Sequence, residues 1–171
     1  EKLMGVARQL AGYNPDFFSC TYGAGGSTRD RTLNTVLQLD GDVGVPTAPH
    51  LSCVGDSKDE LRSLLSQYKN SGIKRIVALR GDLPSGMGMA SGELRYANEL
   101  VEFIRAETGD WFHIEVAAYP ETHPQARSPE ADLKAFATKI QAGASSGITQ
   151  YFYNADAYFR FVEGIQALGV S

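Results

Sequence analysis

The sequence predicts an α/β barrel of parallel strands, of which this chain supplies an incomplete part. Segments with the apolar continuity of buried strands alternate with segments of helical spacing, in the order helix, then five strand–helix pairs. This order is typical of parallel strands joined by right-handed helical crossovers. Polar or ionisable residues recur roughly every thirty residues, where each apolar run stops, as in barrels whose loops meet at one mouth.

The first helix, Leu3–Leu10, is predicted from its helical spacing, and Asp16–Tyr22 reads as a buried strand that ends at a glycine cluster. The same alternation predicts a helix at Arg31–Leu39 and a strand at Pro46–Cys53. Gly25–Ser27 could resemble a phosphate-binding loop. It lacks the lysine of a P-loop and the spacing of a dinucleotide fingerprint, so a tight strand-to-helix turn is the preferred interpretation.

The next helix, Ser57–Ser71, is amphipathic and carries its own boundary signals. Ser57 is a candidate N-cap, Glu60 stands three residues later as in a capping box, and Gly72 follows as a stop. A strand at Lys74–Leu79 comes directly after it.

The second half of the chain repeats the pattern. Pro129 lies in the first turn of the predicted fifth helix and Gly143 lies just beyond its end. Tyr151, Phe152 and Tyr153 alternate within the last predicted strand, so we expect them to be mostly core. The remaining predicted elements are the helix Glu93–Thr108, the strand His113–Tyr119, the helix Pro129–Ala142, the strand Ile148–Tyr153 and the helix Asp156–Leu168.

A five-stranded doubly wound sheet is the competing architecture, but it would gather polar groups at one or two loops near a switch point. Here every strand end carries them, which favours the (β/α)8, or TIM, barrel. His113 stands at the opposite, amino-terminal end of its strand and is expected to be structural. The polar residues at the strand ends are Thr21, Tyr22, His50, Arg80, Asp82, Tyr119, His123 and Gln150.

A closed barrel of this type has eight strands and about 250 residues. With 171 residues and five strands, we expect a single domain, residues 1–171, that lacks the first strand and the last two strands. The open strand edges predict aggregation or dependence on a partner. We therefore expect the natural protein to continue at both ends.

Composition excludes some functions. The formal net charge is −4, and no Lys/Arg run indicates nucleic-acid or anionic-membrane binding. No apolar run approaches the ~20 residues that span a bilayer. Cys20 and Cys53 are too few and too far apart for a disulfide framework or a metal site, so two reduced, buried thiols in a cytoplasmic protein are expected.

Five segments at the strand ends carry a family resemblance. In this order and spacing, they resemble the methylenetetrahydrofolate reductases over essentially the whole chain. The segments are Thr21-Tyr22-Gly23-Ala24-Gly25-Gly26, Ala48-Pro49-His50-Leu51, Ala78-Leu79-Arg80-Gly81-Asp82-Leu83-Pro84, Ala117-Ala118-Tyr119-Pro120-Glu121-Thr122-His123-Pro124 and Ile148-Thr149-Gln150-Tyr151-Phe152.

The resemblance implies a cytoplasmic flavoprotein oxidoreductase of one-carbon metabolism and methionine biosynthesis. It implies bound FAD, reduction of that flavin by NADH or NADPH, and hydride transfer to 5,10-methylenetetrahydrofolate, giving 5-methyltetrahydrofolate. NADH is the expected donor for a short bacterial-type reductase. The expected partners are these small molecules and further copies of the chain in a homo-oligomer, with no nucleic acid and no membrane.

Asp82 is the principal catalytic candidate, because the resemblance places it against both flavin and folate. A carboxylate near the flavin pyrimidine edge disfavours the anionic reduced form and stabilises a cationic iminium form of the folate. The alternative is a carboxylate that only caps a turn. Arg80-Gly81-Asp82 also spells a cell-adhesion tripeptide, but no secretory feature supports that interpretation.

Gln150 is the second catalytic and substrate-binding candidate beside Asp82. The resemblance implies that its amide hydrogen-bonds the pterin and the nicotinamide, which bind alternately to one flavin face, and its sequence position suggests a buried amide.

The remaining flavin contacts follow from the resemblance. His50 and Tyr96 could instead be packing residues, and Asp132 and Lys139, seven apart on one helix face, could be an ordinary solvated pair. Ala135 and Thr138 share that face, where some relatives carry longer groups. The expected cofactor-binding set is Thr21, Tyr22, His50, Arg80, Gly81, Asp82, Tyr96, Ala97, Tyr119, His123, Asp132 and Lys139.

One departure from the family is serious. The family's general acid is a glutamate in a Phe-Glu-Phe-Phe-type run on the first strand, and no such run occurs here. Glu1 stands at the first helix and cannot replace it. We therefore expect the parent protein to reduce folate and the isolated 171-residue chain to have little or no such activity.

Two other functions stay open at this point. One is a different barrel enzyme, such as a phosphate-binding lyase or another pterin-using protein, which would show no flavin absorbance. The other is a non-catalytic fragment that assembles through its strand edges and binds neither FAD nor folate.

Overall fold

A computed structural model describes residues 2–21, 26–81 and 93–170, and of residues 26–30 only the backbone. The helices are α1 (Lys2–Ala11), α2 (Gly26–Val43), α3 (Lys58–Asn70), α4 (Ala97–Thr108), α5 (Pro129–Gln141) and α6 (Ala155–Ala167). The strands are β1 (Phe18–Cys20), β2 (Thr47–Ser52), β3 (Arg75–Leu79), β4 (His113–Ala118) and β5 (Ser146–Thr149).

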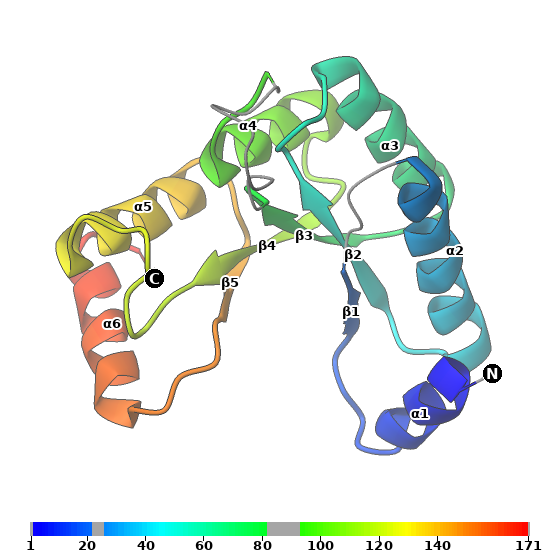
Figure 1. The fold of residues 1–171 in the computed structure, drawn as a ribbon, viewed down its shortest axis with the longest axis horizontal. Coiled ribbons are helices and arrows are strands. Elements are labelled where there is room, and N and C mark those ends of the chain that lie inside the picture. Colours follow the sequence, from blue (N-terminus) through cyan, green and yellow to red (C-terminus); the bar gives the residue numbers. More distant parts are fainter. Residues whose placement is uncertain (1, 22–25, 82–92, 171) are drawn as a thin grey trace.

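The five strands form one parallel sheet in the order in which they occur along the chain. The registers include Phe18 opposite Thr47, Arg75 opposite His113 and Glu115 opposite Ser146. Figure 1 shows the strands in an arc with the helices along its outer side. A doubly wound sheet would reverse its strand order at a switch point. The sequential order and the curl confirm the predicted incomplete barrel.

Successive residues of each strand point to opposite faces of the arc. Ile76 and Ala78 on β3, and Ile114 and Val116 on β4, are fully buried and belong to the hydrophobic core under the helices. The helices contribute to the same core with the fully or almost fully buried side chains of Leu61, Leu65, Tyr68, Leu100, Val101 and Ile104.

A polar group lies toward the amino-terminal ends of β3, β4 and β5. Arg75 of β3 pairs with the buried carboxylate of Glu115 on β4, which also accepts a hydrogen bond from the Ser146 hydroxyl at 2.6 Å. His113 Nε2 lies 2.6 Å from Ser146 Oγ and 3.2 Å from Glu115 Oε1. His113 therefore joins a network remote from the carboxyl ends of the strands, in accord with its predicted structural role.

Local boundary signals are confirmed at α3 and α5. The Ser57 side chain accepts a hydrogen bond from the Glu60 N–H, and the Glu60 carboxylate accepts one from the Ser57 N–H, so the predicted capping box is formed. Pro129 stands in the first turn of α5, where Ser128 is the N-cap. Gly72 and Gly143 both have positive φ beyond the helix ends they were expected to mark.

The predicted limits of α2 and the predicted start of α4 are wrong, and α2 ends at Val43 rather than Leu39. α2 begins at Gly26 rather than Arg31, so Gly26 and Ser27 belong to the helix and not to a tight turn, while Gly25 lies outside the described residues. The intervening segment has no proline, and the helix extends through it. α4 begins later than predicted, at Ala97, with Tyr96 in extended conformation before it.

The carboxyl end of β5 is the third correction. The strand ends at Thr149 instead of Tyr153, and Tyr151 and Tyr153 are 76% and 88% exposed rather than core. The Gln150 N–H still bonds to the Ala118 carbonyl, but the next backbone groups leave the sheet. Asn154 then accepts a hydrogen bond from the Asp156 N–H as the N-cap of α6.

Gly147 on β5 provides a test of the outer packing. A Cβ added there would lie 2.7 Å and 2.8 Å from two ring atoms of Phe136. We expect Gly147→Ala to lower the free energy of unfolding by about 1–3 kcal/mol through overpacking, measured by chemical denaturation. Gly41→Ala in α2 meets nothing within 4 Å, and this control is expected to be neutral or stabilising. If Phe136→Leu did not relieve the Gly147→Ala loss, the proposed clash would be wrong.

Candidate active site

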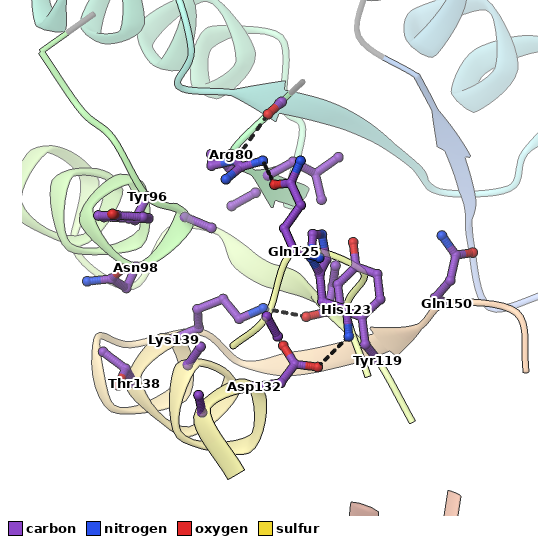
Figure 2. Close-up of a pocket in the computed structure, with 18 residues that line it drawn as sticks. Arg80, Tyr96, Asn98, Tyr119, His123, Gln125, Asp132, Thr138, Lys139 and Gln150 are labelled. Atoms are coloured by element: carbon purple, nitrogen blue, oxygen red, sulfur yellow. Dashed lines mark hydrogen bonds between the residues drawn. The ribbon is translucent and has the colours of Figure 1, made fainter. Parts of the chain in front are cut away.

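A cavity of about 620 Å³ opens at the carboxyl ends of β3, β4 and β5. Figure 2 shows its polar side chains converging from these strand ends, from α5 and from the start of α4. The lining residues are Ala78, Leu79, Arg80, Gly81, Tyr96, Ala97, Asn98, Ala117, Tyr119, His123, Gln125, Ala126, Ala131, Asp132, Ala135, Thr138, Lys139 and Gln150.

The end of β3 is held against β2 by close backbone contact. The Ser52 hydroxyl donates to the Arg80 carbonyl at 2.9 Å. Gly81 has φ +88° and approaches Ser52 so closely that a Cβ would lie 1.9 Å from its Oγ. Only glycine combines this backbone conformation with this approach. The geometry fixes the direction in which the chain leaves β3.

The Arg80 side chain lies across the cavity mouth. One terminal nitrogen of its guanidinium donates to Gln125 Oε1 at 2.7 Å, and its Nε donates to the Gly81 carbonyl at 3.3 Å. Figure 2 shows the Arg80–Gln125 contact joining the β3 end to the loop that follows β4. A guanidinium has five N–H donors, so it can serve both these contacts and a bound anion or carbonyl.

The loop after β4 makes the wall opposite Arg80. The rings of Tyr119 and His123 meet edge to face, with their centroids 4.5 Å apart. The His123 N–H donates to Asp132 Oδ2 at 2.8 Å, and His123 Nδ1 accepts from the Gln125 N–H at 3.0 Å. Thr122 between them has φ +72°, a conformation that costs a β-branched residue free energy. The turn it makes brings His123 to the first turn of α5.

Lys139 is a second cation of the cavity, beside Arg80. Its Nζ donates to the Ala117 carbonyl at the end of β4 and lies 5.5 Å from the Phe136 ring centroid. Burial lowers the pKa of the Lys139 ammonium to about 8, and the Asp132 carboxylate partly opposes that shift. A phosphate group beside Lys139 would restore the charged form, because an opposite charge at short range favours it.

The structure brings most of the predicted site residues to this cavity. Those that line it are Arg80, Gly81, Tyr96, Ala97, Tyr119, His123, Asp132, Lys139 and Gln150. Gln150 is exposed rather than buried, because it follows the end of β5, and its side-chain oxygen accepts from the Tyr151 N–H at 2.9 Å. Asp132 and Lys139 are both partly buried in the wall, so the interpretation as a solvated pair is wrong.

Among the predicted residues that the structure describes, His50 and Thr21 do not line this cavity. His50 on β2 is half-buried, and burial lowers the pKa of its imidazole. Thr21 follows β1, and its carbonyl accepts from the Thr32 hydroxyl at 3.3 Å. Tyr22 and Asp82 lie outside the described residues. Their roles stay predictions.

Two polar residues of the wall were missed from the sequence. Asn98 lies in the first turn of α4, and Gln125 follows His123 by two residues. Gln125 could have been anticipated from its place in the same loop after β4, since such loops supply barrel sites. Asn98 carries no local signal, because its role depends on where α4 packs.

The cavity has the properties of a small-molecule or cofactor site. Such sites have volumes of about 300–1,000 Å³ and mostly apolar walls that carry a few convergent polar groups. Here the alanines at 117, 126, 131 and 135 leave space, Arg80 and Lys139 supply cationic donors, and Tyr119 and His123 supply ring surfaces.

Cys53 lies apart from the lining, and burial raises its thiol pKa to about 11.

Among residues 2–21, 26–81 and 93–170, no helix combines the length and apolarity needed to cross a membrane. The described part of the chain also holds no group of three or more His, Cys, Asp or Glu side chains arranged for a metal ion.

Solved structures with a similar fold include proteins of low sequence identity. A 2,3-dimethylmalate lyase of the PEP mutase/isocitrate lyase superfamily matches with a TM-score of 0.64 at 10% identity, covering 93% of this chain and 59% of that one. An oxaloacetate acetylhydrolase matches with a TM-score of 0.60 at 12% identity, covering 93% and 59%. These likenesses show the fold alone.

Sequence comparison is more specific. The 5,10-methylenetetrahydrofolate reductase of Escherichia coli is 43% identical over 162 residues, covering 95% of this chain and 53% of that protein. Methylenetetrahydrofolate reductase (NADH) 1 of Zea mays is 36% identical over 183 residues, covering 100% and 31%. The chain thus spans about half the length of its bacterial relatives. The family model described as methylenetetrahydrofolate reductase matches residues 1–171, and the chain therefore belongs to the methylenetetrahydrofolate reductase family.

Proposed function

We propose that the polypeptide carrying this chain reduces 5,10-methylenetetrahydrofolate to 5-methyltetrahydrofolate, with FAD as bound cofactor and NADH as the electron source. Family membership supports the reaction. The name of the maize relative supports NADH. Cytoplasmic location and a homo-oligomeric state complete the proposal and rest on the family resemblance.

The observation that carries the proposal is the convergence of cationic and aromatic groups on one cavity. Arg80, Tyr119, His123 and Lys139 come from two strand ends and one helix, and they line the same space. Their separation in sequence, from 80 to 139, means that only the folded barrel assembles them. A flavin needs this mixture of ring contacts and anion-binding donors.

Each group has a defined task in this proposal. Lys139 neutralises a cofactor phosphate, Asp132 accepts from a ribose or adenine group, and the Tyr119–His123 pair packs against the cofactor. Arg80 binds a pyrophosphate or ring carbonyl as a fork of donors. The bound flavin supplies the two-electron chemistry, and Thr21, Tyr22, His50, Gly81, Tyr96 and Ala97 complete the proposed cofactor contacts.

The substrate side of the site uses amide and carboxylate chemistry. Gln150 is proposed to hydrogen-bond the pterin and the nicotinamide in turn, since an amide can both donate and accept. Asp82 is proposed to set the flavin electronics and to stabilise the cationic form of the folate. This chain has no glutamate in a Phe-Glu-Phe-Phe-type run that could serve as the general acid.

Visible spectroscopy of the complete gene product tests the proposal. We expect a yellow protein whose flavin absorbance bleaches anaerobically with NADH and returns on addition of 5,10-methylenetetrahydrofolate. In the isolated 171-residue chain, reoxidation of the flavin by the folate is expected to be far slower, because this chain lacks that glutamate. A colourless gene product that does not bind added FAD would contradict the proposed function. Equal folate reduction by the isolated chain would contradict only the assignment of the general acid.

A further inference from the structure

The loop after β5 carries Gln150, and it is held by a residue from another loop. Glu121, in the loop after β4, accepts hydrogen bonds from two consecutive backbone N–H groups beyond Gln150. Its Oε1 lies 3.0 Å from the Tyr153 nitrogen and 2.9 Å from the Asn154 nitrogen. We propose that Glu121 is a positioning residue for Gln150.

Glu121 makes these hydrogen bonds just after the chain has left the backbone ladder of the sheet. The last ladder bond of this segment joins the Gln150 N–H to the Ala118 carbonyl at 2.7 Å. The Tyr151 N–H bonds to the side chain of Gln150 itself. Asn154 then caps α6. The Glu121 carboxylate therefore fixes the loop at its far end, just before the helix begins.

Glu121 is aimed by the same turn that places His123. The Thr122 N–H donates to the Tyr119 carbonyl at 3.1 Å, and Thr122 adopts φ +72°. On one side of this turn the His123 N–H bonds to Asp132, a residue of the cavity wall. On the other side Glu121 bonds to the loop of Gln150. One turn thus joins the cofactor wall to the substrate-binding residue.

The two N–H groups of Tyr153 and Asn154 share a single acceptor oxygen of Glu121. A glutamine at position 121 retains such an oxygen and loses only the charge, whereas an alanine removes the acceptor. Glu121→Gln and Glu121→Ala therefore separate the hydrogen bonds from the charge. Glu163→Ala, at an exposed position of α6, removes a negative charge from the helix that follows this loop and is the matched control.

The inference rests on the proposed function, so two measurements on the complete gene product are needed. The first is amide hydrogen exchange over residues 151–155, which does not depend on activity. We expect Glu121→Ala to speed exchange there, while Glu121→Gln and Glu163→Ala behave as the parent does. The second is steady-state kinetics with NADH and 5,10-methylenetetrahydrofolate.

In the kinetics, Glu121→Ala is expected to raise KM for both substrates roughly five- to tenfold, the effect of losing about one net hydrogen bond on each. kcat and flavin content should stay near the parent values, since Glu121 does not line the cavity and its carboxylate bonds to the loop after β5. Glu121→Gln should restore KM.

Three results would overturn the inference. They are unchanged exchange in Glu121→Ala, faster exchange with unchanged KM, and a Glu121→Gln variant as impaired as Glu121→Ala. A gene product that binds no FAD would reject the proposed function instead, and the exchange experiment would still decide whether Glu121 holds this loop.

Discussion

Gly81→Ala is expected to remove most FAD binding and to destabilise the protein. The new Cβ would lie 1.9 Å from Ser52 Oγ and 3.1 Å from Ser52 Cβ, on a backbone with φ +88°. The positive φ costs about 1–2 kcal/mol for a residue with a Cβ, and overpacking adds about 1–3 kcal/mol. Relief of the clash must turn the Ser52 hydroxyl away or shift the end of β3, and either movement breaks the hydrogen bond that holds the Arg80 carbonyl.

A misplacement of about 1 Å at a catalytic site costs on the order of 100-fold in rate. We expect a loss of similar size in FAD affinity. FAD affinity is measured by fluorescence titration of the apoprotein, and stability by chemical denaturation. Gly72→Ala is the matched control, because Gly72 has φ +80° and nothing within 4 Å of its Cβ position. Gly72→Ala should lower the free energy of unfolding only by the cost of the positive φ, and it should keep the FAD affinity of the parent. If Ser52→Gly, which removes the opposing side chain, failed to restore binding to Gly81→Ala, steric conflict would not be the cause.

Lys139→Met is expected to weaken FAD binding about 10- to 100-fold at pH 7, the range for loss of a charged hydrogen bond. Without ligand, burial lowers the Lys139 pKa to about 8. A phosphate favours the protonated amine, so affinity should be constant below pH 8. Above it, affinity should fall by at most tenfold per pH unit, until the pH passes the pKa in the complex. Lys139→Met should abolish this pH dependence.

The free energy of unfolding should depend on pH in the opposite direction to the FAD affinity. This difference distinguishes an effect on binding from an effect on folding. The folded pKa lies below the ordinary value of 10.5, so between pH 8 and 10.5 the unfolded chain binds more protons. The contribution of Lys139 to the free energy of unfolding therefore increases as pH rises through that window. Lys139→Met should leave the apoprotein at least as stable at pH 7. Lys134→Met on the exposed side of α5 is the control, and a similar loss of affinity there would contradict the assigned role.

Local sequence signals determined the elements and most of their ends. The capping box of Ser57 and Glu60, the first-turn position of Pro129 and the positive φ of Gly72 depend on neighbours within a few residues. The polar residues at successive strand ends likewise predicted a barrel, because parallel strands must direct those ends to one side. The candidate site could be located for the same reason.

Tertiary structure alone decided where β5 ends and how the cavity wall is joined. The apolar pattern continues from Ile148 to Tyr153, yet the strand stops at Thr149. The Tyr151 N–H bonds to the Gln150 side chain, and the N–H groups of Tyr153 and Asn154 find an acceptor in Glu121, some thirty residues earlier. The Arg80–Gln125 contact and the burial that lowers the Lys139 pKa also depend on packing between distant segments. Periodicity reports which face of an element is apolar, but it carries no information on which remote group will meet a given backbone or side-chain donor.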